Sequence, residues 1–155
     1  MRIATISDAE AITALINQAF RVEWFVYSDR IDLDQVRAHF AKGEFLVADK
    51  DAADHDATLA GCVYIEARGE RSYLGLLSVD PSRQRSGLGA KLMAAAEDRR
   101  RENGSRFMDI LIVNLREELP AFYRRLGYIE DGTAPFPEGV PTKVPCHFVK
   151  MSKPL

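Results

Sequence analysis

Residues 76–104, LLSVDPSRQRSGLGAKLMAAAEDRRRENG, decide what kind of domain this chain forms. The segment begins with the apolar run Leu76–Val79, which is typical of the end of a buried strand. Pro81 ends that strand, because proline lacks the backbone N–H that strand pairing needs. The donor-rich segment Ser82–Gly89 follows, and an amphipathic pattern then predicts a helix that stops near Gly104.

A strand, a glycine-containing loop and a helix in this order favour the binding of an anion. The first turn of a helix has unpaired N–H groups, and the helix dipole adds partial positive charge there. Gly87 and Gly89 let the backbone approach a phosphate closely, while Arg83 and Arg85 add positive charge. We therefore expect a phosphate or pyrophosphate at this loop. The alternative is a glycine turn before an ordinary surface helix.

The spacing of the loop excludes two common phosphate-binding motifs. A P-loop needs Gly-x-x-x-x-Gly-Lys-Ser/Thr, which is absent, and a dinucleotide fingerprint needs a small residue where Leu92 stands. The segment Gln84–Gly89 instead matches Gln/Arg-x-x-Gly-x-Gly/Ala. In this it resembles the acyl-CoA motif of the GNAT superfamily of N-acetyltransferases, which implies acetyl-CoA as cosubstrate.

The resemblance implies which residues hold acetyl-CoA. Backbone amides of the loop would bind the pyrophosphate, and the preceding strand end, together with an asparagine further along, would contact the pantetheine arm. The implied cofactor-binding residues are Leu77, Ser78, Val79, Gln84, Arg85, Ser86, Gly87, Leu88, Gly89, Ala90 and Asn114.

Two catalytic roles follow from the same resemblance. The segment Asn114–Tyr128 resembles the family's asparagine, helical tyrosine and Gly-Phe/Tyr, which implies that Tyr123 is the general acid for the departing thiolate. A tyrosine with a pKa of about 10 is protonated at neutral pH. The alternative is that Tyr123 only packs beside Phe122.

The general base is less clearly marked in the sequence. Family members often use a carboxylate on the strand before the loop, but the strand Ser72–Val79 contains no Asp, Glu or His. Glu66, at the end of the preceding strand, is the first candidate. Glu23 and His147 are the others, each acting through water, and all three could instead be ordinary surface or strand residues.

We expect the acceptor pocket between the segment Phe20–Asp32 and the loop Thr133–Pro145. Aromatic side chains there would enclose an apolar substrate body, and carboxylates would attract its amine. The predicted pocket residues are Glu23, Trp24, Tyr27, Phe136 and His147. The same aromatics could simply cover the sheet.

The order of predicted elements is β-α-α-β-β-β-α-β-α-β-β along residues 1–155, a single acetyltransferase-like domain. This order resembles that of the GNAT fold, which implies an α/β, GNAT-like fold. Its central sheet is mixed and mostly antiparallel, one parallel pair splays apart, and helices cover both faces. A capping box at Ser7–Glu10 is expected to open the first helix, and Asp49–Thr58 to form a polar hairpin loop.

Composition narrows the function classes. A net charge of −2 argues against nucleic acid as a partner, and the run Arg99–Arg101 is expected to be a solvated helix end. No apolar run approaches membrane-spanning length and no secretory signal is seen, which predicts a cytoplasmic protein. Cys62 and Cys146 are expected to be buried thiols, with no metal site.

The sequence therefore predicts an acyl-CoA-dependent N-acetyltransferase. It would transfer acetyl from acetyl-CoA to a primary amine by direct attack in a ternary complex. The acceptor would be a small-molecule amine or a peptide N-terminus, and a homodimer is compatible with this prediction. The alternative is a non-catalytic module that senses acyl-CoA, which the missing strand carboxylate favours.

Overall fold

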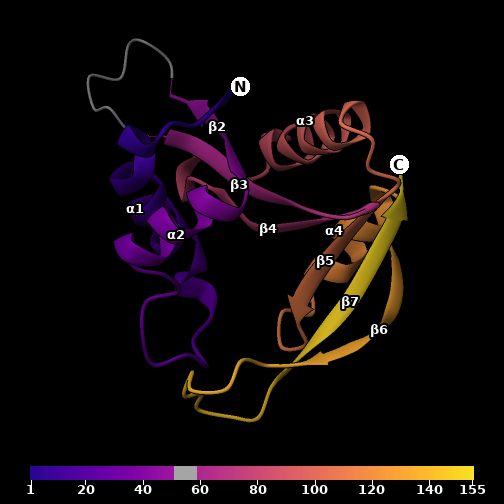
Figure 1. Cartoon of the computed structure of the whole chain (residues 1–155). Helices are drawn as coiled ribbons and strands as arrows, with labels where there is room; N and C mark the ends of the chain where they lie inside the picture. Colours follow the sequence, from indigo (N-terminus) through magenta and orange to yellow (C-terminus); the bar gives the residue numbers. More distant parts are fainter. Residues whose placement is uncertain (51–58) are drawn as a thin grey trace.

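The computed structural model describes residues 1–50 and 59–155, so most of the predicted hairpin loop Asp49–Thr58 lies outside the described residues. Within these ranges seven strands form one sheet in the order β1-β2-β3-β4-β5-β7-β6 (Figure 1). The strands are β1 (Arg2–Ile3), β2 (Glu44–Asp49), β3 (Leu59–Arg68), β4 (Arg71–Val79), β5 (Phe107–Val113), β6 (Ile129–Pro135) and β7 (His147–Pro154). The helices are α1 (Ala9–Ala19), α2 (Leu33–Lys42), α3 (Leu88–Glu102) and α4 (Leu119–Arg125).

The predicted splayed parallel pair is confirmed at β4 and β5. The two strands pair in parallel only over Arg71–Leu74 and Phe107–Ile110. Beyond these positions they diverge, as Figure 1 shows. All other strand pairs are antiparallel, so the α/β fold with a mixed sheet is as predicted.

A bulge accompanies the divergence. Between Cys62 and Tyr64 of β3, the β4 strand carries one extra residue, and Leu76 adopts a positive φ of 56°. Side chains two residues apart on a regular strand share a face, but the extra residue reverses this alternation. Leu74 and Leu76 consequently pack into two different core clusters.

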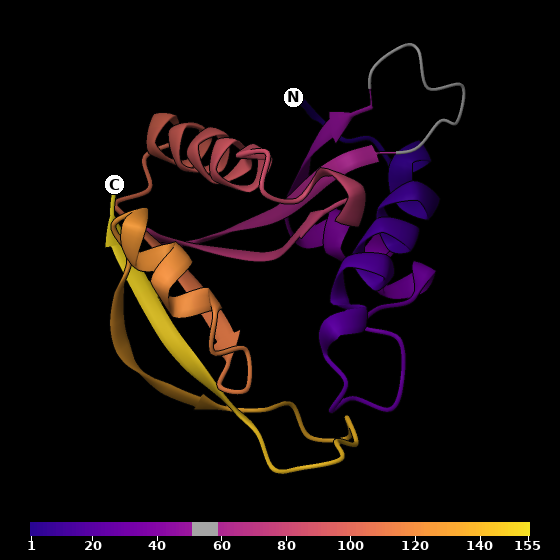
Figure 2. The ribbon, with the colours of Figure 1, turned by 180° about the vertical axis from the view of Figure 1, so that it is seen from behind.

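Those two clusters lie on opposite faces of the sheet. The first packs α1 and α2 against side chains such as Phe45 and Val47, and the second packs α3 and α4 against Leu46 and Met108. Figure 2 shows α3 and α4 on the face turned away from α1 and α2. Period-two alternation in β2 thus supplies both cores from one strand.

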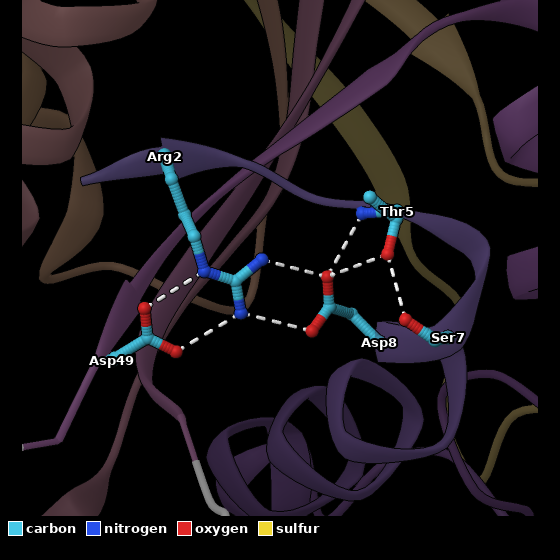
Figure 3. Close-up of polar contacts among 5 residues, drawn as sticks. All are labelled: Arg2, Thr5, Ser7, Asp8 and Asp49. Atoms are coloured by element: carbon cyan, nitrogen blue, oxygen red, sulfur yellow. Dashed lines mark hydrogen bonds and ion pairs between the residues drawn. The ribbon is translucent and has the colours of Figure 1, made fainter.

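The start of α1 differs from the prediction. A short 3-10 turn at Ile6–Asp8 precedes the helix, and the reciprocal contact is between Thr5 and Asp8 instead of Ser7 and Glu10. The Thr5 N–H donates to Asp8 Oδ2 at 2.8 Å (Figure 3). Arg2 holds this turn in place, because its guanidinium donates to both Asp8 and Asp49 and so joins β1 and β2 to the turn.

Three further expectations about local structure were wrong. The loop expected at Thr133–Pro145 starts later, because strand β6 continues to Pro135 and pairs with β7. Cys146 is partly exposed and precedes β7, whereas Cys62 is buried. The arginine run is not simply solvated: Arg99 makes a two-pronged ion pair with Glu44, and Arg100 donates to the buried Ser72 hydroxyl at 2.9 Å.

Candidate functional site

A cavity of about 650 Å³ occupies the gap between the diverging strands β4 and β5. We call it the cleft. From Gly75 to Ser78 no described strand pairs with the β5-facing edge of β4, so backbone N–H and C=O groups remain for a ligand. The residues predicted from the family motif that line the cleft are Leu77, Val79, Gln84, Arg85, Gly87, Leu88, Gly89 and Ala90.

The loop between β4 and α3 has a defined backbone. Asp80 accepts hydrogen bonds from the N–H and the hydroxyl of Ser82 and pairs with Lys50 at 2.9 Å. These contacts lower the pKa of Asp80 to about 2, and the contact with Lys50 contributes most. Arg85 and Gly87 both adopt positive φ, and a side chain at Gly87 would meet nothing within 4 Å. Open space therefore lies over the first turn of α3.

Two of the predicted cofactor residues on this side do not line the cleft. Ser78 is buried and its hydroxyl donates to the Leu76 carbonyl, while the Ser86 hydroxyl donates to the Arg83 carbonyl at 2.6 Å. Their side chains serve the backbone of the strand and the loop. Their backbone groups remain predicted cofactor contacts.

The charges around the cleft are mostly positive. Its charged lining residues are Glu23, Arg30, Arg83, Arg85, Arg116, Glu118 and Arg125. Arg116 pairs with Glu23 and Glu118, whereas the positive charges of Arg85 and Arg125 suit a ligand that carries several phosphates. Sequence reasoning missed Arg30, Arg116 and Arg125 as lining residues, because only the fold brings these three segments together.

Tyr123 lines the cleft from α4 and is largely buried. Burial raises its pKa to about 12, although the nearby Arg116 opposes the shift. The hydroxyl is therefore protonated at neutral pH and is available as a donor. Its ring packs against those of Phe122 and Tyr128, with centroids 5.0 and 6.0 Å away.

A second cavity, of about 790 Å³, adjoins the cleft, and we call it the side cavity. Both cavities are lined by Glu23, Arg30, Val113 and Phe148, so the two spaces meet at these side chains. The predicted pocket residue Phe136 lines the side cavity and packs on Phe148, with ring centroids 5.3 Å apart.

Glu23 is a buried carboxylate at this junction. Its Oε2 accepts from Arg116 Nη1 at 3.0 Å, and Arg116 also donates to Glu118 at 2.7 Å. Burial raises the pKa of Glu23, while Arg116 and, more weakly, Arg30 oppose the shift. A carboxylate with a raised pKa is a better proton acceptor than an ordinary one.

Four other predicted side chains lie outside both cavities. Glu66 accepts hydrogen bonds from Tyr64 and Arg68. Burial raises the pKa of Glu66, but those two bonds outweigh it, and the pKa lies below its usual range. Trp24 and Tyr27 are 59% and 67% exposed, and His147 is exposed at the start of β7.

Asn114 also does not line either cavity. Its side-chain oxygen accepts from the His147 N–H at 2.9 Å, and its own N–H donates to the His147 carbonyl. This exchange extends the pairing of β5 with β7 by one residue. The contact of Asn114 with the cofactor stays a prediction.

The loops at the far end of the gap contact each other. Val26 forms an isolated bridge with Thr142, and the Lys143 N–H donates to the Phe25 carbonyl at 2.7 Å. Figure 2 shows the two loops meeting below the sheet. We call this contact the clip, and together with the ion pair of Glu23 and Arg116 it closes the gap opposite the paired end.

Two kinds of feature are absent from the described part of the chain. No helix among residues 1–50 and 59–155 is both long and apolar enough to cross a bilayer. Within the same ranges, no three His, Cys, Asp or Glu side chains gather in a way that could hold a metal ion.

Comparison with known proteins agrees with this geometry. A family model for an acetyltransferase (GNAT) domain matches residues 9–153, whereas no curated protein matches significantly. Nourseothricin acetyltransferase superposes with a TM-score of 0.77 at 23% identity, covering 99% of this chain and 96% of that one. Ribosomal-protein-alanine N-acetyltransferase from Brucella melitensis gives 0.75 at 21%, covering 99% and 98%.

A third solved structure, yncA from Salmonella typhimurium with its cofactor acetyl-CoA, gives a TM-score of 0.75 at 22% identity, covering 99% and 92%. At these identities the solved structures establish a shared fold. The family match spans nearly all of the sequence. The chain therefore belongs to the GNAT acetyltransferase family.

Proposed function

We propose that this chain transfers an acetyl group from acetyl-CoA to a primary amine by direct attack in a ternary complex. One observation carries the proposal: the cleft and the side cavity meet at a buried carboxylate, Glu23, and the cleft is also lined by a protonated tyrosine, Tyr123. A donor and an acceptor bound in the two spaces would meet at this junction.

The lining of the cleft supports acetyl-CoA as the donor. When bound, acetyl-CoA supplies the thioester. The unpaired β4 edge from Gly75 to Ser78 would bind the amides of the pantetheine arm, and the N–H groups at the start of α3 would bind the pyrophosphate. Arg85 and Arg125 line the cleft and add charge for the phosphates.

Glu23 and Tyr123 would handle the protons. Glu23 takes the proton that the ammonium group must lose, directly or through water, so that the neutral amine forms a C–N bond to the acetyl carbon. The C–S bond then breaks, and the Tyr123 hydroxyl donates to the departing sulfur. A second carboxylate, Glu66, was the first candidate from the sequence, but its bonds to Tyr64 and Arg68 hold it outside both cavities.

A matched pair of variants tests the proposal and decides between the two carboxylates. Glu23→Gln should lower kcat/KM for any amine acceptor about 100-fold, whereas Glu66→Gln should change it less than about threefold. The wild-type kcat/KM should rise with pH as Glu23 ionises, and this limb should disappear in Glu23→Gln.

Calorimetry with acetyl-CoA controls for misfolding, since both variants should retain wild-type affinity. If Glu66→Gln lowered kcat/KM more than Glu23→Gln, Glu66 would be the general base. Tight acetyl-CoA binding without turnover of any amine in a broad acceptor panel would favour the acyl-CoA sensor instead.

A further inference from the structure

Four of the eight polar side chains that line the side cavity are already occupied by the protein itself. The Asp32 carboxylate and the Gln35 amide form a reciprocal cap at the start of α2, with bonds of 2.8 and 2.9 Å. Asn17 exchanges two hydrogen bonds with the Ile31 backbone, and the Thr13 hydroxyl donates to the Ala9 carbonyl. These groups shape the wall and have little capacity left for a ligand.

Two groups at the junction with the cleft, Glu23 and Arg30, do retain that capacity, and the exposed side chains of Ser28 and Asp29 also line the side cavity. Glu23 uses Oε2 for Arg116, and its Oε1 accepts no hydrogen bond from any described residue. The Arg30 guanidinium lies 5.5 Å above the Phe20 ring, and among residues 1–50 and 59–155 no hydrogen-bond acceptor or carboxylate pairs with it. Arg30 therefore offers its N–H donors to the space that it lines.

The two groups are also close to each other. Arg30 is near enough to lower the pKa of Glu23, and both side chains line both cavities. A negative and a positive group a short distance apart match a ligand whose ammonium and acidic groups are separated by a few bonds. The apolar part of the cavity wall consists of Val26, Ile31, Leu33, Val113, Phe136, Pro137, Val140 and Phe148.

We propose that the acceptor is an α-amino acid with an apolar side chain. Glu23 Oε1 would bind its ammonium group, Arg30 would bind its carboxylate, and the apolar wall would hold its side chain. This inference rests on the proposed function and names the substrate class of the same site. The reaction forms an N-acetyl amino acid, CoA and one proton.

This chemistry disfavours two other amine classes. A polyamine has no anionic group to pair with Arg30 and would contact only the carboxylates of the wall, such as Glu23 and Asp29. A peptide N-terminus carries an amide where the amino acid has its carboxylate, so it would leave the guanidinium without a charged partner.

The experiment compares L-leucine, L-methionine, L-phenylalanine and L-tyrosine with their C-terminal amides. For at least one pair, the free acid should have a kcat/KM at least about tenfold higher than the amide, as expected for a charge-assisted contact. Arg30→Gln should lower kcat/KM for that acid about tenfold or more and leave the amide within about threefold. Arg21→Gln removes an exposed arginine that lines neither cavity and should leave both values unchanged.

The outcomes distinguish failure of the amino-acid assignment from failure of the proposed function. Amides that are acetylated as well as the acids would overturn the amino-acid assignment and leave acetyl transfer intact. The assignment is also overturned if acetyl-CoA binds by calorimetry and other amines turn over, but none of the eight compounds does. Loss of acetyl-CoA binding altogether would instead count against the proposed function.

Discussion

The two halves of β4 differ in strand pairing and in what their backbone groups do. From Arg71 to Leu74 the strand has partners on both sides, β3 and β5. At that end Arg71 binds Asp109 through two bonds of 2.7 and 2.5 Å, and Ser152 of β7 donates to the same carboxylate. From Gly75 onward the strand keeps β3, loses β5 and borders the cleft.

The difference shows how one strand can provide both stability and a binding site. The paired half satisfies its backbone groups within the sheet, whereas the open half leaves them for a ligand. The bulge at Leu76 lies just beyond the last paired residue, and an extra residue of this kind bends a strand locally. Substitutions at the open end should therefore change activity, and those at the paired end should change stability.

The largest effect is expected at Tyr123. Tyr123→Phe keeps the ring and its packing and removes only the donor, so kcat should fall about 100-fold or more while acetyl-CoA affinity changes little. The control is Tyr128→Phe, which removes a buried hydroxyl that donates to Glu97 at 3.1 Å and lies outside the cleft. Steady-state kinetics and acetyl-CoA calorimetry measure both, and an unchanged kcat in Tyr123→Phe would disprove its role as the acid.

A pair of glycines gives the next largest effect. Gly87 at the open end and Gly69 at the paired end have positive φ values of 83° and 68°, and an added side chain would meet nothing within 4 Å at either. Both Asp variants should therefore suffer similar backbone strain. Only Gly87→Asp adds a carboxylate at the predicted pyrophosphate site, so it alone should weaken acetyl-CoA binding at least tenfold, about 1.4 kcal/mol. Equal Kd values for the two variants would contradict the site.

The smallest effect is expected at the paired end itself. Asp109→Asn removes the charge that pairs with the partly exposed Arg71 and should cost about 1 kcal/mol of unfolding free energy at pH 7. Arg71 lowers the pKa of Asp109 in the folded state. The stabilisation is thus present above the unfolded pKa of about 4 and is lost as pH falls through the folded value, where the two proteins should converge.

Denaturant titrations at several pH values measure that convergence. Acetyl-CoA affinity should be the same in wild type and Asp109→Asn. A variant that binds acetyl-CoA several-fold more weakly would show that the two ends of β4 are not independent.

Local sequence was sufficient for much of the fold. The strand, the loop and α3 are contiguous in the chain, so their residue types predicted an anion site at the start of α3, and the resemblance to the GNAT family predicted the cleft beside it. The crossover through α3 predicted the parallel pairing of β4 with β5. The cap of α1 was misplaced because Thr5 and Asp8 form the same kind of pattern as Ser7 and Glu10, and the contact of Arg2 with Asp8 favours the earlier one.

The junction between the two cavities could not be predicted in the same way. Glu23 and Arg116 are 93 residues apart, and neither segment has a motif that indicates their ion pair. The choice among Glu66, Glu23 and His147 depends on which side chain faces the gap. Side-chain contacts decide this, because Tyr64 and Arg68 hold Glu66 whereas the distant Arg116 holds Glu23. Arg30 was missed because a single exposed arginine in a loop has no distinguishing pattern.

The clip described above has a mechanical consequence. The gap between β4 and β5 is closed at both ends. At one end the two strands pair over four residues and Arg71 binds Asp109. At the other end Val26 contacts Thr142 and Phe25 contacts Lys143. Any motion that widens the gap strains the contacts at both of its ends. The clip has fewer hydrogen bonds than the paired end, so it should open first while β4 and β5 move about their paired residues.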